Sequence, residues 1–116
     1  MIAINAQTRV YFARDPLDMR KQIDGIALAV QEILQLDPFS THVFVFSNKQ
    51  RNKLKLLYWH ANGFCLLYKR LEKGRFPWPS RDSVALEYGL RELQWLLEGF
   101  RLEDLPAQQT LKYSKV

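Results

Sequence analysis

The sequence has few of the residues that mark disulfide-stapled or membrane proteins. A single cysteine, Cys65, excludes an intramolecular disulfide and is typical of a reducing cytosol. The longest stretch without a charge, residues 56–68, is only 13 residues long, too short to span a bilayer, and Asn62-Gly63 interrupts it. The first residues lack the basic segment of a signal peptide. We therefore expect a cytoplasmic protein with no membrane partner.

Motifs of catalysis and cofactor binding are also missing. There is no P-loop, G-x-G-x-x-G, C-x-x-C or H-x-x-x-H pattern. His42, His60 and Cys65 offer donors for zinc or for a Cys-His nucleophile, but without the usual ligand number or spacing. The closest group of acids, between residues 15 and 24, lies where a helix is expected to begin and fits capping. We expect no enzyme activity, no metal and no cofactor.

Acidic residues are scarce in one part of the chain. The whole sequence of 116 residues has a net charge of +5, but residues 47–81 hold nine basic residues and a single acid, Glu72. The rest of the chain holds eight basic and eleven acidic residues. Because binding depends on the local field, this basic middle indicates a polyanionic partner more strongly than the net charge does.

Hydrophobic periodicity and turn residues predict one compact domain over residues 1–102. Asp15 and Pro16 are expected to open the first helix as N-cap and first helical residue. We expect strands at 9–13, 42–46, 53–60, 64–71 and 84–86, helices at 16–35 and 88–98, and a polar, mobile tail at 103–116. These elements predict an α+β fold in which an antiparallel sheet is built on a central hairpin and two helices cover an apolar face.

The hairpin centres on Asn62-Gly63, the favoured pair for a type I′ turn. Taking these two as the turn residues places Lys55 opposite Arg70. Two like charges in that position destabilise a strand pair unless they splay into solvent or share a bound anion.

Basic residues interleaved with aromatic ones are typical of nucleic-acid binding, with cations on phosphates and rings on exposed bases. Of the aromatic residues, Trp59 and Phe64 are expected in the core, and Trp78, between two prolines, on the surface. The candidate phosphate contacts are Lys49, Arg51, Lys53, Lys55, Lys69, Arg70, Lys73 and Arg75. We expect affinity to fall steeply with salt, and alanine at Lys69 and Arg70 to weaken binding to all sequences alike.

Several of these segments resemble one small bacterial family. They are Asp18-Met19-Arg20-Lys21 with Asp24-Gly25, Asp37-Pro38-Phe39-Ser40, Val43-Phe44-Val45-Phe46-Ser47-Asn48, Lys53-Leu54-Lys55-Leu56-Leu57 with Trp59, Gly63-Phe64, Tyr68-Lys69-Arg70-Leu71-Glu72-Lys73-Gly74-Arg75-Phe76 with Trp78-Pro79, and Leu96-Leu97-Glu98-Gly99. Occurring in this order over about residues 9–100, they resemble TnpB, the second-reading-frame accessory protein of the insertion-sequence-sixty-six group of transposons. This family is unrelated to the RNA-guided nuclease of the same name.

The resemblance implies a non-catalytic accessory of DNA transposition that works beside a separate, larger transposase. Its implied partners are DNA, at element ends or elsewhere, the transposase and the element's other small accessory protein; DNA binding would place it at the nucleoid. The rival interpretation is a protein–protein adaptor anchored by Asp18, Met19, Arg20 and Lys21 and by Phe76 and Trp78, since Arg and Trp dominate interface energetics. The oligomeric state is left open.

Overall fold

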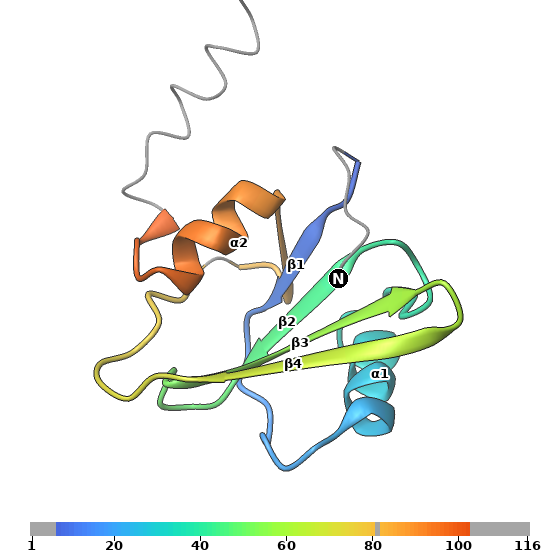
Figure 1. Ribbon diagram of the computed structural model, residues 1–116, viewed down its shortest axis with the longest axis horizontal. Coiled ribbons are helices and arrows are strands. Elements are labelled where there is room, and N and C mark those ends of the chain that lie inside the picture. The colour runs from blue at the N-terminus through green and yellow to red at the C-terminus, as the bar shows by residue number, and fades with distance from the viewer. Residues whose placement is uncertain (1–6, 81, 103–116) are drawn as a thin grey trace, which may run out of the picture.

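The computed structural model describes residues 7–80 and 82–102. Five strands form one sheet in the order β4-β3-β2-β1-β5 (Figure 1). The strands are β1 (Val10–Ala13), β2 (Val43–Ser47), β3 (Lys53–His60), β4 (Gly63–Arg70) and β5 (Ala85–Tyr88), and the helices are α1 (Ile23–Glu32) and α2 (Leu90–Leu97). The predicted α+β class is confirmed. The sheet is mixed, however, because β1 and β2 run parallel on either side of the crossover through α1.

The first helix is shorter than predicted, because it begins at Ile23 rather than near Pro16. The amide of Leu17 donates to the Ser47 carbonyl at the end of β2 (2.8 Å). Asp18 accepts from the amide of Arg20 (2.9 Å) in a local turn. Residues 16–22 thus form hydrogen bonds to β2 and within a turn rather than in a helix. Asp15 is therefore not the N-cap that the sequence predicted.

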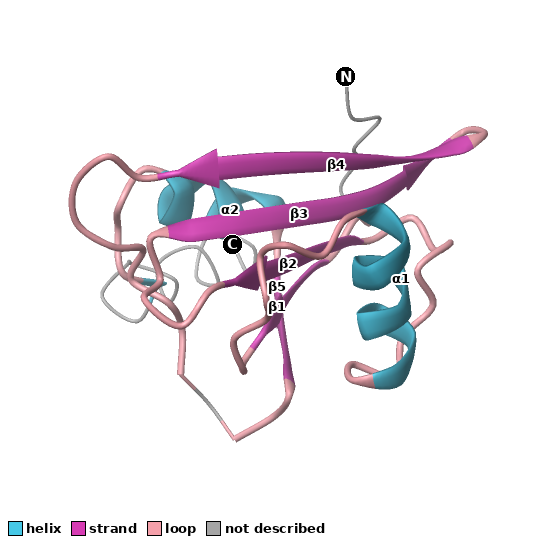
Figure 2. Cartoon of the chain, turned by 90° about the horizontal axis from the view of Figure 1, so that it is seen from below, coloured by secondary structure: helices cyan, strands magenta, loops and turns pink. Residues whose placement is uncertain are grey.

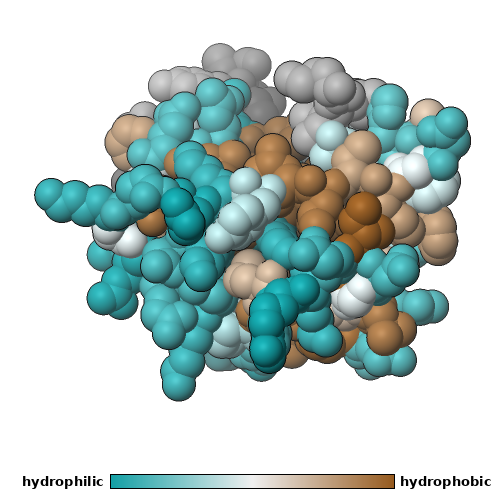
Figure 3. Space-filling model, turned by 60° about the horizontal axis from the view of Figure 1, so that its bottom comes forward, coloured by the Kyte–Doolittle hydropathy of each residue, from teal (hydrophilic) through white to brown (hydrophobic). Residues whose placement is uncertain are grey.

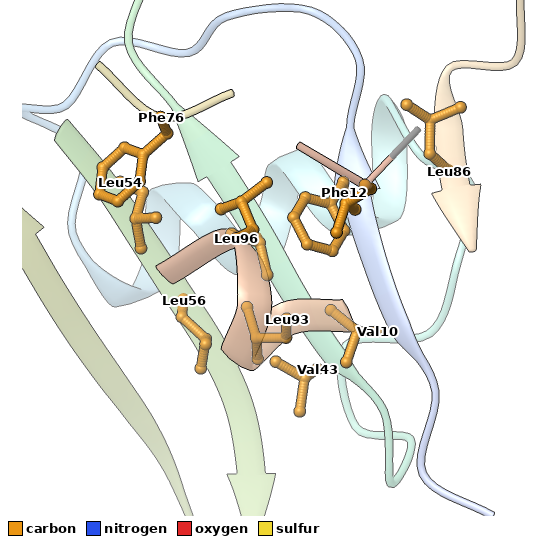
Figure 4. Close-up of a cluster of buried hydrophobic side chains, with 11 residues drawn as sticks. Val10, Phe12, Val43, Leu54, Leu56, Phe76, Leu86, Leu93 and Leu96 are labelled. Atoms are coloured by element: carbon orange, nitrogen blue, oxygen red, sulfur yellow. The ribbon is translucent and has the colours of Figure 1, made fainter. Parts of the chain in front are cut away.

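The two helices cover opposite faces of the sheet, whereas the sequence analysis placed both on one apolar face (Figures 1 and 2). Side chains alternate along each strand, so each strand supplies both faces. On one face, Leu93 and Leu96 of α2 lie over Val10, Val43 and Leu54 (Figure 4). On the other, Ile26, Ala29 and Val30 of α1 pack on Phe44, Phe46 and Leu57.

The hairpin register differs from the predicted one by two residues. His60 pairs with Gly63, so Ala61 and Asn62 form the turn, and Ala61 takes a positive φ of 55°. A shift of two keeps every side chain on its face. It places Tyr68, not Arg70, opposite the buried Lys55, and this avoids two like charges in contact at that position.

Three aromatic rings gather near the tip of the hairpin. Trp59 and Phe64 are half-buried and meet Phe39, which is exposed, at ring-centre distances of 5.0–5.1 Å. Phe64 packs against the core of the α1 face, and neither ring is fully buried, so the two predicted core residues lie at the edge of the core rather than at its centre.

Within residues 7–80 and 82–102, no helix is both long and apolar enough to cross a membrane. The predicted tail at 103–116 lies outside the described residues, as do the first six residues of the predicted domain.

Candidate nucleic-acid interface

The basic loops come together at one end of the sheet, where β3 begins and β4 ends (Figure 1). The amide of Leu71 donates to the Asn52 carbonyl (2.8 Å), and the amide of Phe76 donates to the Arg51 carbonyl (2.6 Å). These bonds join the loop between β2 and β3 to the loop that follows β4. We call this region, formed by residues 48–53 and 70–75, the basic end.

Asn48 holds the shape of the first of these loops. Its Oδ1 accepts from the amides of Asn52 and Lys53 (3.1 Å each), and its Nδ2 donates to Oδ1 of Asn52 (2.7 Å). Asn often organises turns in this way, because its short amide can substitute for backbone partners. Arg51 sits inside this turn with a positive φ of 59°. The neighbouring side chains are therefore presented from a fixed backbone.

Five of the eight predicted phosphate contacts reach solvent at the basic end. Lys49, Arg70, Lys73 and Arg75 are exposed, and Lys53 is half-buried opposite Arg70. Arg70 also pairs with Glu72, the one acid of this region, at 3.0 Å. Hydrophilic side chains fill the corresponding half of the surface in Figure 3, while the other half carries a hydrophobic band.

Lys55 does not belong to that surface. Its side chain is only 5% exposed, and its Nζ donates to the Lys21 carbonyl (2.8 Å) and to Oε1 of Gln22 (3.4 Å). The ammonium also lies 5.7 Å from the centre of the Tyr68 ring. Lys55 thus fastens the segment before α1 to β3, and it is not available as a phosphate contact in this conformation.

Lys69 also has an internal partner. It lies on the α2 face of β4, half-buried, and its Nζ donates to the carbonyl of Leu97 at the end of α2 (2.9 Å). A cation is favourable there because the last carbonyls of a helix are unpaired and carry partial negative charge. Lys69 and Arg70 therefore point to opposite faces of the sheet, which a prediction from sequence proximity could not reveal.

Arg51 is tied into the structure by its guanidinium. Nη2 donates to the Arg14 carbonyl (2.8 Å), and the guanidinium lies 5.1 Å from the centre of the Trp78 ring. Burial lowers the pKa of Arg51, and the charge of Asp15 opposes this shift. The ring of Trp78 is held as well, since its Nε1 donates to the Ala13 carbonyl (2.9 Å). Trp78 is thus half-buried rather than a freely exposed side chain.

Three arginines from outside the predicted set lie close to the basic end. Arg14, which follows β1, and Arg101, which follows α2, line a pocket of about 610 Å³ together with Arg51 and Arg75. Arg20 lines a second pocket beside Lys49. Sequence reasoning missed Arg14 and Arg101 because each is isolated among neutral or acidic residues. It named Arg20, which precedes Lys21, only as a protein-interaction residue, and the fold brings all three near the middle segment.

The predicted protein-interaction residues divide into two groups. Phe76 is 2% exposed and is part of the core under α2, so it cannot anchor a partner in this conformation. Asp18, Met19 and Arg20 instead line a pocket of about 600 Å³ with Lys49, Lys53 and Tyr68. Lys21 is exposed nearby. The fold thus places this motif directly beside the basic end.

An ion pair orders the exposed part of that motif. The guanidinium of Arg20 donates to both carboxylate oxygens of Asp18, with the shortest contact at 2.7 Å. This pair, with the amide of Arg20, lowers the pKa of Asp18 to about 2. Among the described residues, no group of three or more histidines, cysteines or acids is arranged to hold a metal ion.

Comparison with known proteins matches residues 8–107 to the model of the IS66 Orf2 like protein family. Two uncharacterized proteins of Sinorhizobium fredii are similar over almost their whole lengths. One, y4hO, is 35% identical across all of this chain and 99% of its own. The other, y4jC, is 30% identical over 97% of this chain and 98% of its own. No solved structure matches the chain significantly.

The fold and the basic end define a small, basic α+β domain whose cations converge from separate loops. The chain belongs to the IS66 Orf2-like family, and it is a transposition-associated accessory protein.

Proposed function

We propose that this protein assists transposition by binding DNA through the basic end. The observation that carries the proposal is the convergence of Lys49, Lys53, Lys73 and Arg75 with Arg70, which has one acidic neighbour, Glu72. Cations on long flexible side chains suit contacts to phosphates, which position a duplex without reading its sequence. The chemistry of strand transfer is assigned to the separate transposase.

The proposal predicts a definite salt dependence. Each phosphate neutralised by a cation contributes about 0.9 to the slope of log K against log salt for duplex DNA. If all five cations of the basic end engage, the slope is about −4 to −5. Lys55 and Lys69 contribute little, because each is held by a backbone carbonyl.

The test is a fluorescence-anisotropy titration of the protein against labelled element-end and random duplexes at several salt concentrations. We expect Lys49→Ala with Lys73→Ala to weaken both duplexes equally and to make the slope about 2 less steep. Arg9→Ala is the matched control for charge: Arg9 pairs with Glu87 near the opposite end of the sheet. It removes one charge, as Lys49→Ala alone does, and it should change affinity much less than Lys49→Ala.

Three results would exclude this function. The first is binding that does not depend on salt, and the second is no binding to either duplex. The third is a loss of affinity on Arg9→Ala as large as the loss on Lys49→Ala, because net charge rather than the basic end would then be responsible.

A second candidate function is a protein–protein adaptor. It is favoured by the pocket beside the basic end, because apolar side chains such as Leu17 and Met19 line it together with cations such as Lys49. Such a mixed lining suits an acidic, partly apolar partner segment. Here the partner is the transposase or the element's other accessory protein. Co-purification with the transposase from nuclease-treated lysate, abolished by Met19→Ala and Arg20→Ala and accompanied by no shift of free DNA, distinguishes the adaptor from the DNA-binding protein.

A further inference from the structure

Four arginines converge on one pocket at the edge of the basic end. Arg14, Arg51, Arg75 and Arg101 come from four segments separated in sequence, and they line a space of about 610 Å³. None of the described residues that line this pocket is acidic. We call it the arginine pocket. Like charges brought together without an anion repel, so such a site is suited to a strongly anionic ligand.

The contacts of Arg14 and of Arg51 differ in kind. Nε and Nη2 of Arg14 donate to the two carboxylate oxygens of Asp15 (3.1 and 3.3 Å). Arg51 instead donates from Nη2 to the neutral carbonyl of Arg14. Its Nη1 is buried and has no hydrogen-bond partner in the described part of the chain. The charge of Asp15 opposes the effect of burial on Arg51, and a bound anion close to Nη1 would offset more of the free energy lost through desolvation.

The walls of the arginine pocket are aromatic and apolar as well as cationic. The half-buried Pro77 and Trp78 line it, together with the buried Phe76 and Pro79. The Trp78 ring is fixed by the bond from its Nε1 to Ala13 and by an edge contact with Phe12 at 5.4 Å. A rigid aromatic wall beside cations fits a planar base as well as a phosphate.

The size of the pocket agrees with such a ligand. A volume of about 610 Å³ is within the range of sites that enclose a small organic molecule, and it exceeds what a lone inorganic phosphate would fill. Bases inside a duplex are stacked and paired, so a concave site of this kind receives a nucleotide only from a single strand or from free solution.

We propose that the arginine pocket binds a nucleoside phosphate, presented by single-stranded DNA, with the phosphate on the guanidiniums and the base against the aromatic wall. That the nucleoside phosphate comes from DNA rests on the proposed function. The other exposed cations of the basic end would then contact adjoining phosphates of the strand, and Arg75 belongs to both surfaces. The protein would accordingly prefer single-stranded or frayed ends to intact duplex.

The first test measures anisotropy with a labelled single strand and with a duplex of the same sequence at fixed salt. Arg75→Ala removes an exposed side chain of the pocket, and we expect it to weaken single-strand binding about tenfold and duplex binding less than threefold. Arg75→Lys keeps the charge but not the planar fork, and should recover only part of the loss. Lys49→Ala, outside the arginine pocket, is the control and should weaken both forms alike.

The second test adds a deoxynucleoside monophosphate, with inorganic phosphate at equal ionic strength as the comparison. Binding is followed by NMR at the indole N–H of Trp78, with that of Trp59 in the ring cluster near the hairpin tip as internal control. We expect the nucleotide to shift the Trp78 signal, to leave Trp59 unchanged and to displace the single strand. Inorganic phosphate should compete at least tenfold less well.

The outcomes separate this inference from the proposed function. If DNA binds but the nucleotide neither shifts Trp78 nor competes, and Arg75→Ala weakens single strand and duplex equally, the arginine pocket is refuted and the basic end stands. If the nucleotide binds and no DNA does, the arginine pocket is supported as a site for a free nucleotide, and the DNA-binding function is refuted. Equal competition by inorganic phosphate refutes the part assigned to the aromatic wall.

Discussion

Lys55 provides the sharpest test of the difference between the sequence-based prediction and the structure. As a phosphate contact, it would affect DNA binding and leave folding unchanged. As the structure places it, the side chain is 5% exposed and bonded to the carbonyl of Lys21. Its replacement should therefore affect stability and leave DNA binding almost unchanged.

The expected magnitude follows from what Lys55→Ala removes. Three buried methylene groups are lost, each worth up to about 0.8 kcal/mol. A charge-assisted hydrogen bond to the Lys21 carbonyl is also lost, with a net value of about 1.5–3 kcal/mol, while the relief of a buried charge acts in the opposite direction. We expect the free energy of unfolding to fall by about 2–4 kcal/mol. Lys55→Met keeps the apolar stem and should cost about 1–2 kcal/mol.

The assay is urea denaturation followed by tryptophan fluorescence. With a slope of about 1.5 kcal/mol per M, Lys55→Ala should lower the midpoint by about 2 M without changing the slope. Lys49→Ala is the control and should shift stability by less than about 0.5 kcal/mol, because that side chain is exposed. DNA affinity of the folded Lys55→Met protein should stay within about twofold. An unchanged midpoint for Lys55→Ala, with a loss of DNA affinity equal to that of Lys49→Ala, would refute the internal role of Lys55.

Two further predictions concern single interactions. Lys69→Ala removes the bond to the Leu97 carbonyl and should lower the free energy of unfolding by about 1 kcal/mol, measured by the same urea titration; an unchanged midpoint would contradict the contact. Arg20→Gln should raise the pKa of Asp18 from about 2 toward 4, measured by carboxyl NMR over pH 1.5–6. Since a lowered pKa in the folded state stabilises the fold above the unfolded pKa, that contribution is lost as pH falls from about 4 to 2. The variant should show a weaker dependence, because the amide of residue 20 still donates to Asp18.

The local patterns of the sequence located the elements well. Strand β3 has the predicted bounds, and Gly99, with a φ of +100°, ends α2 as the sequence indicated. The first helix was placed too early because Asp15-Pro16 is a good N-terminal signal that tertiary hydrogen bonds overrode. The turn of the hairpin was predicted one residue too late, because Asn-Gly is a strong turn signal. In the structure, the cross-strand pairs set the register instead.

The candidate site was predictable as a segment but not as a surface. The charge pattern identified residues 47–81 as the basic part, and six of the eight named cations lie at the basic end, with the guanidinium of one, Arg51, bonded to an internal carbonyl. The pattern could not separate these from Lys55 and Lys69, because burial and partners depend on which face a strand side chain meets. It also missed Arg14 and Arg101, which reach the same end only through the fold.

The sequence by itself determined that this is one small basic domain of α+β type in the IS66 Orf2-like family, since composition, periodicity and motif order are properties of the chain. Only the tertiary structure decided which cations are free and which are internal. Two loops joined by backbone hydrogen bonds bring Arg51, Arg75 and Trp78 to one pocket. The segment before α1 holds Lys55 on one face of the sheet, and the end of α2 holds Lys69 on the other. The physical reason is that burial and hydrogen-bond partners decide whether a charged side chain can contact a ligand. Both are set by residues that are distant in sequence.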